Sequence, residues 1–386
     1  MVPEGWEVKE LDALCKKIAV GLAISVTPHM RNEGVKLIRN QNIKRNYFND
    51  RSVIYIDPEF AEANRSKKVK PGDIVAVRTG SNIGEACVVP AEFDGALTFT
   101  TLIARPDPKL LDSFFLSTHI NSDRGVAEVN RLCAGGGKPN LNSGELKRYR
   151  LLAPPLPEQK KIAQILTTWD KAITTTEQLL ANSQQQKKAL MQQLLTGKKR
   201  LLNKNGVRFS GEWRFLTFDE AFKVANKKSA QVKSSDYLAT GSVPVVDQGK
   251  ELIAGYCDND ERYTNVPVII FGDHTRCLKW VDFEFCPGAD GTQVLDSKEF
   301  LDKKFGYYLL CHTDIPNLGY SRHMRELKEK DFKVPVDMIE QQKIAAVLST
   351  TDQEISALQK KLDALKQEKK ALMQQLLTGK RRVTLR

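Results

Sequence analysis

The stretch EQKKIAQILTTWDKAITTTEQLLANSQQQKKALMQQLLTGK at 158–198 occurs a second time, as EQQKIAAVLSTTDQEISALQKKLDALKQEKKALMQQLLTGK at 340–380. The two copies are 182 residues apart, align without a gap and are identical at 23 of 41 positions. A repeat of this kind indicates that the chain is a duplication, and that the two copies form its frame.

Both copies are predicted to be long helices, because their apolar residues recur three and four positions apart, as along a coiled-coil seam. Pro157 suits a first helical turn, Asp337 with Glu340 forms a capping-box pattern, and Gly197 and Gly379 suit helix C-caps. A helix of about 39 residues would be about 58 Å long.

A long helix with a narrow apolar stripe needs a partner, and the other copy can supply one by pairing about a pseudo-twofold axis. We therefore predict an antiparallel coiled coil, with two unrelated amphipathic helices on separate domains as the alternative. The predicted interface consists of Ile173, Leu180, Leu190, Leu194, Ile355, Leu358, Leu362, Leu365, Leu372 and Leu376.

The charge of the chain favours a polyanionic partner. It has 386 residues and a formal net charge of +12, but it also carries 47 acidic residues, which is typical of a folded basic protein. Its seven cysteines form no CxxC pair, so we expect reduced thiols and neither a zinc site nor a disulfide frame. No apolar run has transmembrane length, and the N-terminus lacks a signal-peptide pattern, so we expect a cytoplasmic protein.

Two globular α/β domains are predicted at 1–155 and 203–337, each followed by a helical spacer, at 156–202 and 338–386. The fold class is therefore α+β. The domains echo each other at an offset of 207 residues, since Trp6 recurs as Trp213 and Gln41 as Gln248. Within the first domain, residues 5–18 have a short helix pattern, 35–39 a strand pattern and 110–121 a helix pattern.

The sequence contains no recognisable catalytic motif. A phosphate-binding GxxxxGK[ST] loop is absent, as are a glycine-rich methyltransferase turn and an HExxH helix. Glu145–Lys147 and Glu326–Lys328 read ExK, as in metal-dependent nucleases, but no aspartate on a preceding strand accompanies them. We expect no catalysis and no metal site in this chain, with an ExK nuclease as an alternative that magnesium-dependent cleavage would reveal.

Polar and basic side chains gather on predicted loop tips of both domains, and such groups hydrogen-bond base edges and phosphates. Each one alone could be a solvated loop residue, but as sets on a duplicated scaffold they predict a DNA-binding surface. In the first domain they are Arg31, Arg39, Asn40, Gln41, Lys44, Arg78, Thr79, Ser81, Asn82, Lys138 and Asn140. In the second they are Gln248, His274, Arg276, Lys279, Thr292, Gln293, Tyr320, Ser321, Arg322 and His323.

Two short basic runs, Lys198–Arg200 and Lys380–Arg382, end the two repeats. Cations there are favourable to the negative end of a helix dipole, so we expect them to be helix-end partners and not DNA contacts.

The chain resembles a known family at several of these motifs. PPLPEQKKIAQIL, the paired KKALMQQLLTGK endings, GDIVAVRTGSNIG, GGGKPNLNSGELKRYRLLAPPLPEQ and FGDH are together similar to the specificity subunits of type I restriction-modification systems. The resemblance covers nearly the whole chain, with both recognition domains and both helical spacers in the family's order. The spacer motifs are the specific ones, since the recognition domains vary with the target.

This resemblance implies a subunit without catalysis or cofactor of its own, bound to double-stranded DNA. It implies two methyltransferase subunits as partners, which use S-adenosylmethionine, and two restriction subunits, which use ATP and magnesium. Each recognition domain would read one half of a bipartite, asymmetric target, and the helix pair would set the unread gap. The alternatives are a coiled-coil protein that binds DNA nonspecifically or binds a protein, and a specificity subunit without a cognate methyltransferase.

Overall fold

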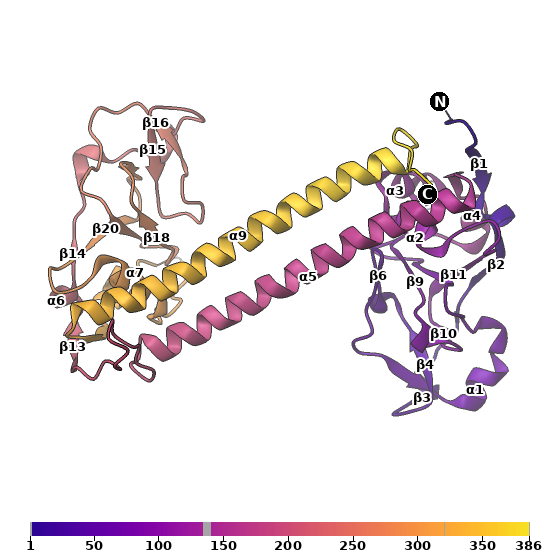
Figure 1. Ribbon diagram of the computed structural model, residues 1–386, viewed down its shortest axis with the longest axis horizontal. Coiled ribbons are helices and arrows are strands. Elements are labelled where there is room, and N and C mark those ends of the chain that lie inside the picture. Colours follow the sequence, from indigo (N-terminus) through magenta and orange to yellow (C-terminus); the bar gives the residue numbers. More distant parts are fainter. Residues whose placement is uncertain (1, 134–139, 320, 386) are drawn as a thin grey trace. The chain divides into compact units, whose positions relative to one another are not determined.

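The computed structural model describes residues 2–133, 140–319 and 321–385 of the chain. The chain divides into two compact units (Figure 1). The first unit comprises Met1–Glu177 and Lys361–Arg386, and the second comprises Gln178–Lys360. Each unit therefore contains one globular domain and a part of each long helix.

The two long helices are α5 (Leu156–Leu194) and α9 (Met338–Leu376), each of 39 residues. Both begin just before the repeated segment and end at its TGK turn, where Gly197 and Gly379 take left-handed φ values of 74° and 68°. Glycine adopts this conformation without the steric cost that a Cβ would add, which is why it ends helices.

Within the first unit the two helices run antiparallel. Asp170 of α5 pairs with Lys369 of α9, and further along α5 Glu177 pairs with Lys366 at 2.8 Å. Residue numbers rise along one helix while they fall along the other, as an antiparallel pair requires.

The second unit shows the same direction of pairing, because Lys187 of α5 pairs with Asp352 of α9. Along the helices the predicted seam positions are withdrawn from solvent, as coiled-coil packing requires. Thr176 and Ser183, which interrupt the apolar seam of the first copy, are also buried. Four predicted seam residues are buried, namely Leu180, Leu194, Leu362 and Leu376, and six are half-buried, namely Ile173, Leu190, Ile355, Leu358, Leu365 and Leu372.

The globular part of the first unit is built from short strands and helices. Its strands are β1 (Glu7–Glu10), β2 (Cys15–Val20), β3 (Met30–Arg31), β4 (Val35–Ile38), β5 (Ile43–Lys44), β6 (Tyr47–Phe48), β7 (Ile54–Ile56), β8 (Ile74–Val77), β9 (Ala86–Val88), β10 (Leu97–Thr98), β11 (Thr101–Pro106) and β12 (Arg150–Ala153). Its helices are α1 (Pro58–Ala63), α2 (Ser113–Asn121), α3 (Asp123–Cys133) and α4 (Ser143–Lys147).

The globular part of the second unit has fewer elements. Its strands are β13 (Trp213–Thr217), β14 (Phe222–Val224), β15 (Val243–Val246), β16 (Gly255–Cys257), β17 (Val268–Gly272), β18 (Leu278–Val281), β19 (Cys286–Pro287), β20 (Thr292–Ser297) and β21 (Asp331–Pro335). Its helices are α6 (Phe218–Ala221), α7 (Lys303–His312) and α8 (Met324–Lys328).

The two globular parts share one sheet topology. The four-stranded order β2-β11-β8-β9 of the first unit recurs as β14-β20-β17-β18 in the second, and the pair β1-β12 recurs as β13-β21. The order β10-β4-β7 recurs as β19-β15-β16, with a parallel first pair and an antiparallel second pair in both units. The duplication inferred from the helices therefore extends through the two globular parts, and the α+β fold class is confirmed.

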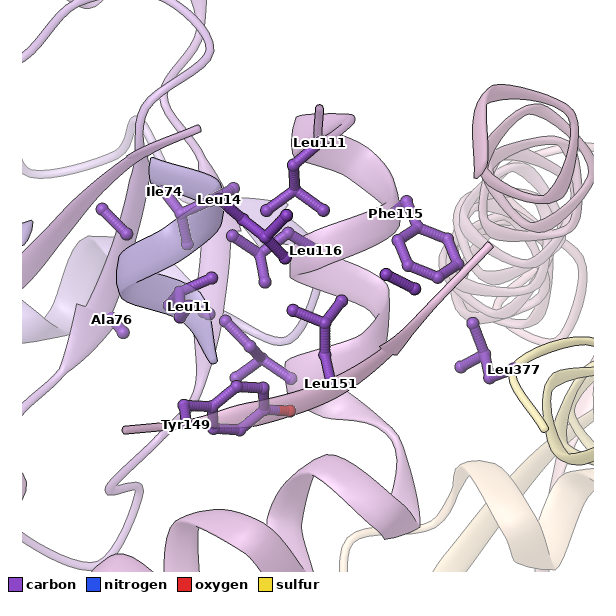
Figure 2. Packing of buried hydrophobic residues seen from close by; sticks show 14 of the residues in the cluster. Leu11, Leu14, Ile74, Ala76, Leu111, Phe115, Leu116, Tyr149, Leu151 and Leu377 are labelled. Atoms are coloured by element: carbon purple, nitrogen blue, oxygen red, sulfur yellow. The ribbon is translucent and has the colours of Figure 1, made fainter. Parts of the chain in front are cut away.

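The main core of each unit joins its domain to the helix pair. In the first unit, Leu11, Phe115 and Leu151 are buried in one cluster that also contains Leu377, next to the end of α9 (Figure 2). In the second unit, Leu194 at the end of α5 is buried in the corresponding cluster. Burial of this kind stabilises by about 1.5–3 kcal/mol per large apolar side chain, so the helix ends belong to the domain cores.

Local patterns outside the helices were predicted with mixed success. The strand at 35–39 is confirmed as β4, and the helix at 110–121 is confirmed over Ser113–Asn121. The helix predicted at 5–18 is wrong, because this segment forms β1, a 3-10 turn at Leu11–Leu14 and β2. Strand β2 pairs with β11 over most of its length, and this long-range pairing overrides the local helical spacing.

The start of α9 also differs from the predicted capping box. The Asp337 side chain accepts a hydrogen bond from the backbone of Ile339 at 2.8 Å, as an N-cap should. The Glu340 carboxylate, however, accepts from Arg200 Nη2 at 2.6 Å. Arg200 was expected to be a helix-end dipole partner, and its buried ion pair to Glu340 corrects both expectations. The repeat explains the geometry, because Glu158 and Arg382 form the same pair in the first unit.

Candidate nucleic-acid interface

A hairpin tip between β8 and β9 carries the first group of predicted DNA-binding residues. The loop closes by hydrogen bonds between Val77 and the residues that follow it, with Gly80 and Gly84 at positive φ. Arg78 donates from Nε to Asn140 Oδ1 at 3.1 Å, and Thr79 forms a β-bridge with Asn140. The segment that precedes α4 is thereby attached to the hairpin tip.

This arrangement suits base recognition. The bond from Arg78 to Asn140 uses Nε and does not involve the two terminal nitrogens, which are the pair that can bind guanine in a bidentate manner. Ser81 and Asn82 are exposed beside it, with the Ser81 hydroxyl 3.5 Å from Asn82 Oδ1. The predicted residue Lys138 lies outside the described residues.

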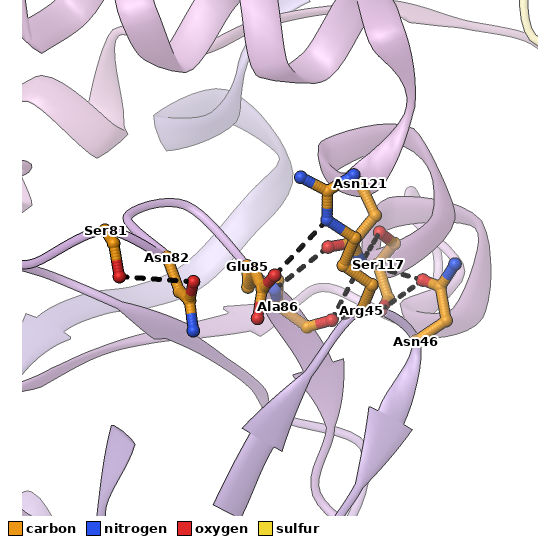
Figure 3. Close-up of polar contacts among 8 residues, drawn as sticks. All are labelled: Arg45, Asn46, Ser81, Asn82, Glu85, Ala86, Ser117 and Asn121. Carbon is orange, nitrogen blue, oxygen red and sulfur yellow. Dashed lines mark hydrogen bonds and ion pairs between the residues drawn. The ribbon is translucent and has the colours of Figure 1, made fainter. Parts of the chain in front are cut away.

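A buried asparagine, Asn121, is hydrogen-bonded to Ala86, which follows this tip on β9 (Figure 3). Asn121 donates from Nδ2 to Asn46 Oδ1, Ala86 O and Ser117 O at 2.7–2.8 Å, and its Oδ1 accepts from the Ala86 backbone at 3.1 Å. The amide therefore joins α2, β9 and the turn at Asn46, where φ is 57°. Arg45, next to this turn, is 62% exposed and pairs with Glu85 at 3.3 Å. Asn46 and Asn121 are not among the residues predicted from the sequence, because neither shows a local pattern.

A second polar group surrounds the turn before β5. The Arg39 guanidinium donates to Ser52 O at 2.9 Å, and Gln41 donates to the same oxygen at 3.3 Å. Among the described residues, Arg39 Nε and Asn40 Oδ1 are buried without a hydrogen-bond partner. Buried polar atoms normally have partners, so these two atoms are exceptions to the usual pattern. Lys44, on β5, is exposed.

Arg31 is hydrogen-bonded to the residue that caps helix α1. It donates to Asp57 Oδ2 at 3.0 Å and to the backbone oxygens of Pro28 and Met30. Asp57 is the N-cap of α1, and the hydrogen bond from the Phe60 backbone contributes most to a pKa below the usual range of an aspartate. The structure thus shows Arg31 bracing a helix cap.

The hairpin tip between β17 and β18 is the equivalent of the β8–β9 tip. His274 and Arg276 lie on it, and Gln248 Oε1 accepts from the His274 backbone at 3.1 Å. Arg276 has a φ of 60°, and its Nη1 donates to Ile315 O at 2.9 Å. The tip is therefore held by the segment after α7, and Gln248, His274 and Arg276 are brought together.

Three predicted residues of the second domain are buried, which corrects the expectation that they lie at exposed loop tips. Lys279 is 5% exposed and donates to Asp247 O at 2.7 Å, and burial lowers its pKa. Thr292 is 2% exposed. His323 is fully buried, and its Nε2 accepts from the Leu318 backbone at 3.3 Å, so its Nδ1 carries the proton and donates to the Asp273 carbonyl. These side chains shape the loops from within.

The remaining predicted residues lie nearer the surface. Gln293 is half-buried and accepts from Asn226 Nδ2 at 2.7 Å, while Ser321 and Arg322 are exposed just before α8. Tyr320 lies outside the described residues. Asp273 joins this segment to the hairpin tip, because its side chain accepts from the Met324 backbone at 2.7 Å. In both units, therefore, the same hairpin tip contacts the segment that precedes α4 or α8.

None of the helices in the described part of the chain is long and apolar enough to cross a membrane.

Comparisons with known proteins agree with this architecture. Residues 3–183 match the family described as type I restriction modification DNA specificity domain. The chain is 24% identical to the putative type I restriction enzyme MjaX specificity subunit of Methanocaldococcus jannaschii, over 99% of this chain and 95% of that protein. It is 35% identical to the EcoR124I/EcoR124II specificity subunit of Escherichia coli over 26% of this chain and 25% of that protein.

Solved structures show the same fold. The type I restriction-modification S subunit from M. genitalium superposes with a TM-score of 0.65 at 16% identity, over 100% of this chain and 97% of that one. A chain from a structure on complex assembly and conformational transition of the type I system gives a TM-score of 0.52 at 16% identity, over 98% of each chain. In its family match over residues 3–183, its full-length relatives and its duplicated fold, the chain is similar to the specificity subunits of type I restriction-modification systems.

Proposed function

We propose that this chain is the non-catalytic, DNA-reading subunit of a type I restriction-modification enzyme. Residues 1–155 and 203–337 act as the recognition domains, and residues 156–202 and 338–386 act as the spacers. One observation carries this proposal: the two hairpin tips lie at equivalent places in the two units but carry different side chains. The β8–β9 tip presents Arg78 and Thr79, whereas the equivalent β17–β18 tip presents His274 and Arg276.

Two equivalent readers with different side chains favour a bipartite target with two unlike halves. Base edges in the major groove differ in their donor and acceptor patterns, so different tip residues select different bases. Each of α5 and α9 is one uninterrupted helix of 39 residues, which supports a fixed number of unread base pairs between the halves. Half-site spacing follows protein geometry in the same way in dimeric DNA-binding proteins.

The repeated outer surface of the helices is suited to bind two copies of one partner, the methyltransferase subunit. In the first unit, Ile165, Trp169 and Leu372 line an apolar groove of about 640 Å³. The repeat places Val347 and Leu190 at the positions of Ile165 and Leu372 in the second unit, where both are half-buried, and Thr351 at the position of Trp169, so the apolar surface is repeated only in part. Apolar surface of this kind is typical of protein interfaces.

The chemistry belongs to the partners in this proposal. The methyltransferase subunits use S-adenosylmethionine to methylate adenine, and restriction subunits, recruited through them, use ATP and magnesium. This chain supplies only the DNA sequence preference, and it acts in the cytoplasm, where bacterial and archaeal DNA is found.

A domain exchange tests the proposal. Residues 1–150 are replaced by those of another specificity subunit, the chimera is co-expressed with the methyltransferase subunit, and adenine methylation is mapped across the genome. We expect one half of the methylated motif to change and the other half and the gap to stay the same. The reciprocal exchange of 203–337 is the matched control and should change only the other half. A change of both halves by either exchange would contradict separate reading.

A further inference from the structure

Each unit has a basic pocket where its recognition domain meets the helix pair. The first basic pocket, of about 550 Å³, is lined by Arg45 and Arg124 of the domain and by Lys366, Lys369 and Lys370 of α9. The second basic pocket, of about 670 Å³, is lined by Lys187 and Lys188 of α5 and by the end of α7. The two pockets were not predicted from the sequence, although the identical Lys-Lys pairs in both repeats are a signal that could have identified them.

The pockets occupy equivalent places in the duplication. Lys369 and Lys370 correspond to Lys187 and Lys188 by the 182-residue offset. On the domain side, the first basic pocket is lined by residues at and after the end of α2, and the second by residues at and after the end of α7. A feature that persists in both halves, while the reading tips differ, indicates a task that does not depend on the target sequence.

Both pockets have an excess of positive charge. The first basic pocket is lined by five cationic side chains and two acidic ones, Asp123 and Asp170. Three of the cations are ion-paired, Arg45 with Glu85, Lys366 with Glu177 and Lys369 with Asp170, so Arg124 and Lys370 supply its excess of positive charge. The second is lined by Lys187, Lys188 and Lys198 and one acidic residue, Asp314. Lys187 is ion-paired with Asp352, so Lys188 and Lys198 supply its excess of positive charge. Cationic side chains that lie close together attract an anion, and the attraction is strongest for a polyanion.

Each pocket continues the surface that carries its reading tip. Arg45 and Asn121 line the first basic pocket and also a crevice of about 130 Å³ that contains Ser81 of the β8–β9 tip. In the second unit, Arg276 of the β17–β18 tip donates to Ile315 O, next to Asp314 of the second basic pocket. A strand held at either tip would therefore have cations beside it on the side of the helices.

We propose that the two basic pockets bind the sugar-phosphate backbone of DNA next to the bases that the tips read. This inference rests on the proposed function, because it assumes that the tips bind DNA. Lysine and arginine on phosphates fix the position of a protein on DNA and carry no sequence information, which fits their persistence in both halves. The helices thus contribute directly to DNA affinity.

The alternative occupant is a protein partner, and the observations favour DNA. The groove at Trp169 is lined by α5, α9 and the segment Arg381–Thr384, shares no residue with the first basic pocket, and is not connected to a reading tip by any shared lining residue. The first basic pocket has an apolar floor, including Met373, but its rim is cationic and continuous with the reading tip. Aliphatic stems of lysines cover such floors while their charges stay in solvent.

The test uses the assembled complex of this chain with its methyltransferase subunit. Lys370→Gln removes one charge from the first basic pocket, and Lys188→Gln removes the corresponding charge from the second. Lys171→Gln with Lys361→Gln, on exposed helix positions outside the pockets, is the matched control. Binding to a duplex with the methylated motif and to a scrambled duplex is measured between 50 and 300 mM salt, roughly the range in which phosphate contacts dominate the salt dependence.

We expect the pocket variants to bind both duplexes more weakly by similar factors, roughly fivefold per lysine near physiological salt. The slope of log K against log salt is negative, and its magnitude should fall by about one for each lysine removed. The ratio of the affinities for the two duplexes should not change. The control should match the wild type. An unchanged slope overturns the proposal, and loss of methyltransferase from the complex with an unchanged slope would assign the pockets to the protein partner.

The same measurements distinguish failure of the proposed function from failure of this inference. If the wild-type complex did not prefer the motif over the scrambled duplex, sequence reading would be contradicted. The salt slopes on the scrambled duplex would still decide whether the pockets contact phosphates.

Discussion

The Glu158 carboxylate accepts hydrogen bonds from Arg382 at 2.7 Å from Nε and 2.9 Å from Nη2, and Glu340 has the same relation to Arg200. Each glutamate lies in the first turn of one long helix, and each arginine follows the end of the other. Arg382 also donates to Glu4 O and lies 5.7 Å from the Trp6 ring centroid. The two pairs therefore fasten the start of each helix to the end of its partner, once in each unit.

The Arg200 pair is expected to be the more sensitive to mutation. Glu340 is fully buried, and the Arg200 side chain is only 19% exposed, against 46% for Arg382. Arg200→Ala would leave an unpaired buried carboxylate, which typically costs about 3–5 kcal/mol. Thermal unfolding of the full chain measures the effect, with Lys199→Ala as the exposed control. Equal melting temperatures for the two variants would show that the pair does not fasten the helix.

Stability is expected to fall in mild acid because of His119. This side chain is buried against the Tyr149 hydroxyl, at 2.8 Å from Nδ1, and burial lowers its pKa from 6.5 to about 4. Protonation then favours the unfolded state, so stability present above pH 6.5 is lost as the pH falls towards 4. The full difference is on the order of 3 kcal/mol.

This prediction is checked by unfolding measurements at several pH values. His119→Gln should remove most of the loss between pH 6.5 and 4, although other groups will still titrate in both proteins. An identical pH dependence in wild type and variant would exclude His119 as the cause.

Arg78→Ala should weaken binding to the target if this arginine makes a bidentate base contact, by about 1–3 kcal/mol, and relax the preference at one position. The same change at Arg276 is expected to have a mixed effect, because Arg276 also holds the loop through Ile315. Affinity for the methylated motif and for its single-base variants provides the measurement. Unchanged affinity and preference for Arg78→Ala would remove it from the reading surface.

Insertion of four residues near Gln184 of α5 should lengthen the unread gap and leave both half-sites unchanged, because that position lies in the uninterrupted helix and outside both domains. The methylation motif of the variant reports the gap directly. A variant that methylates the original motif with its original gap would contradict the role of the helices as a spacer.

The sequence predicted the parts of the fold that depend on local periodicity. The long helices follow from apolar residues spaced by three and four, and the duplication follows from direct comparison of the repeats. By contrast, residues 5–18 form strands because of their pairing with distant strands, such as β2 with β11, which no local spacing reveals. The 207-residue offset predicted that the domains are repeated, but their matching strand orders depend on long-range pairing and were not predicted.

The candidate site was predicted in outline and not in detail. Arg78, Asn140 and Ser81 lie together at one tip, but Lys279, Thr292 and His323 are inside the second domain. Their polar character suggested exposure, whereas their hydrogen bonds to the protein explain their burial. The partners that satisfy a buried polar group, such as the Asp273 carbonyl for His323, are 50 residues away and cannot be identified from composition.

The most direct test of the central claim is to co-express this chain with its methyltransferase subunit and map adenine methylation across the genome by single-molecule sequencing. We expect one bipartite motif with two unlike halves and a single fixed gap. Absence of methylation from a complex shown to form, or methylation without a fixed gap, would contradict the proposal that the two domains read separate halves at a distance set by the helices.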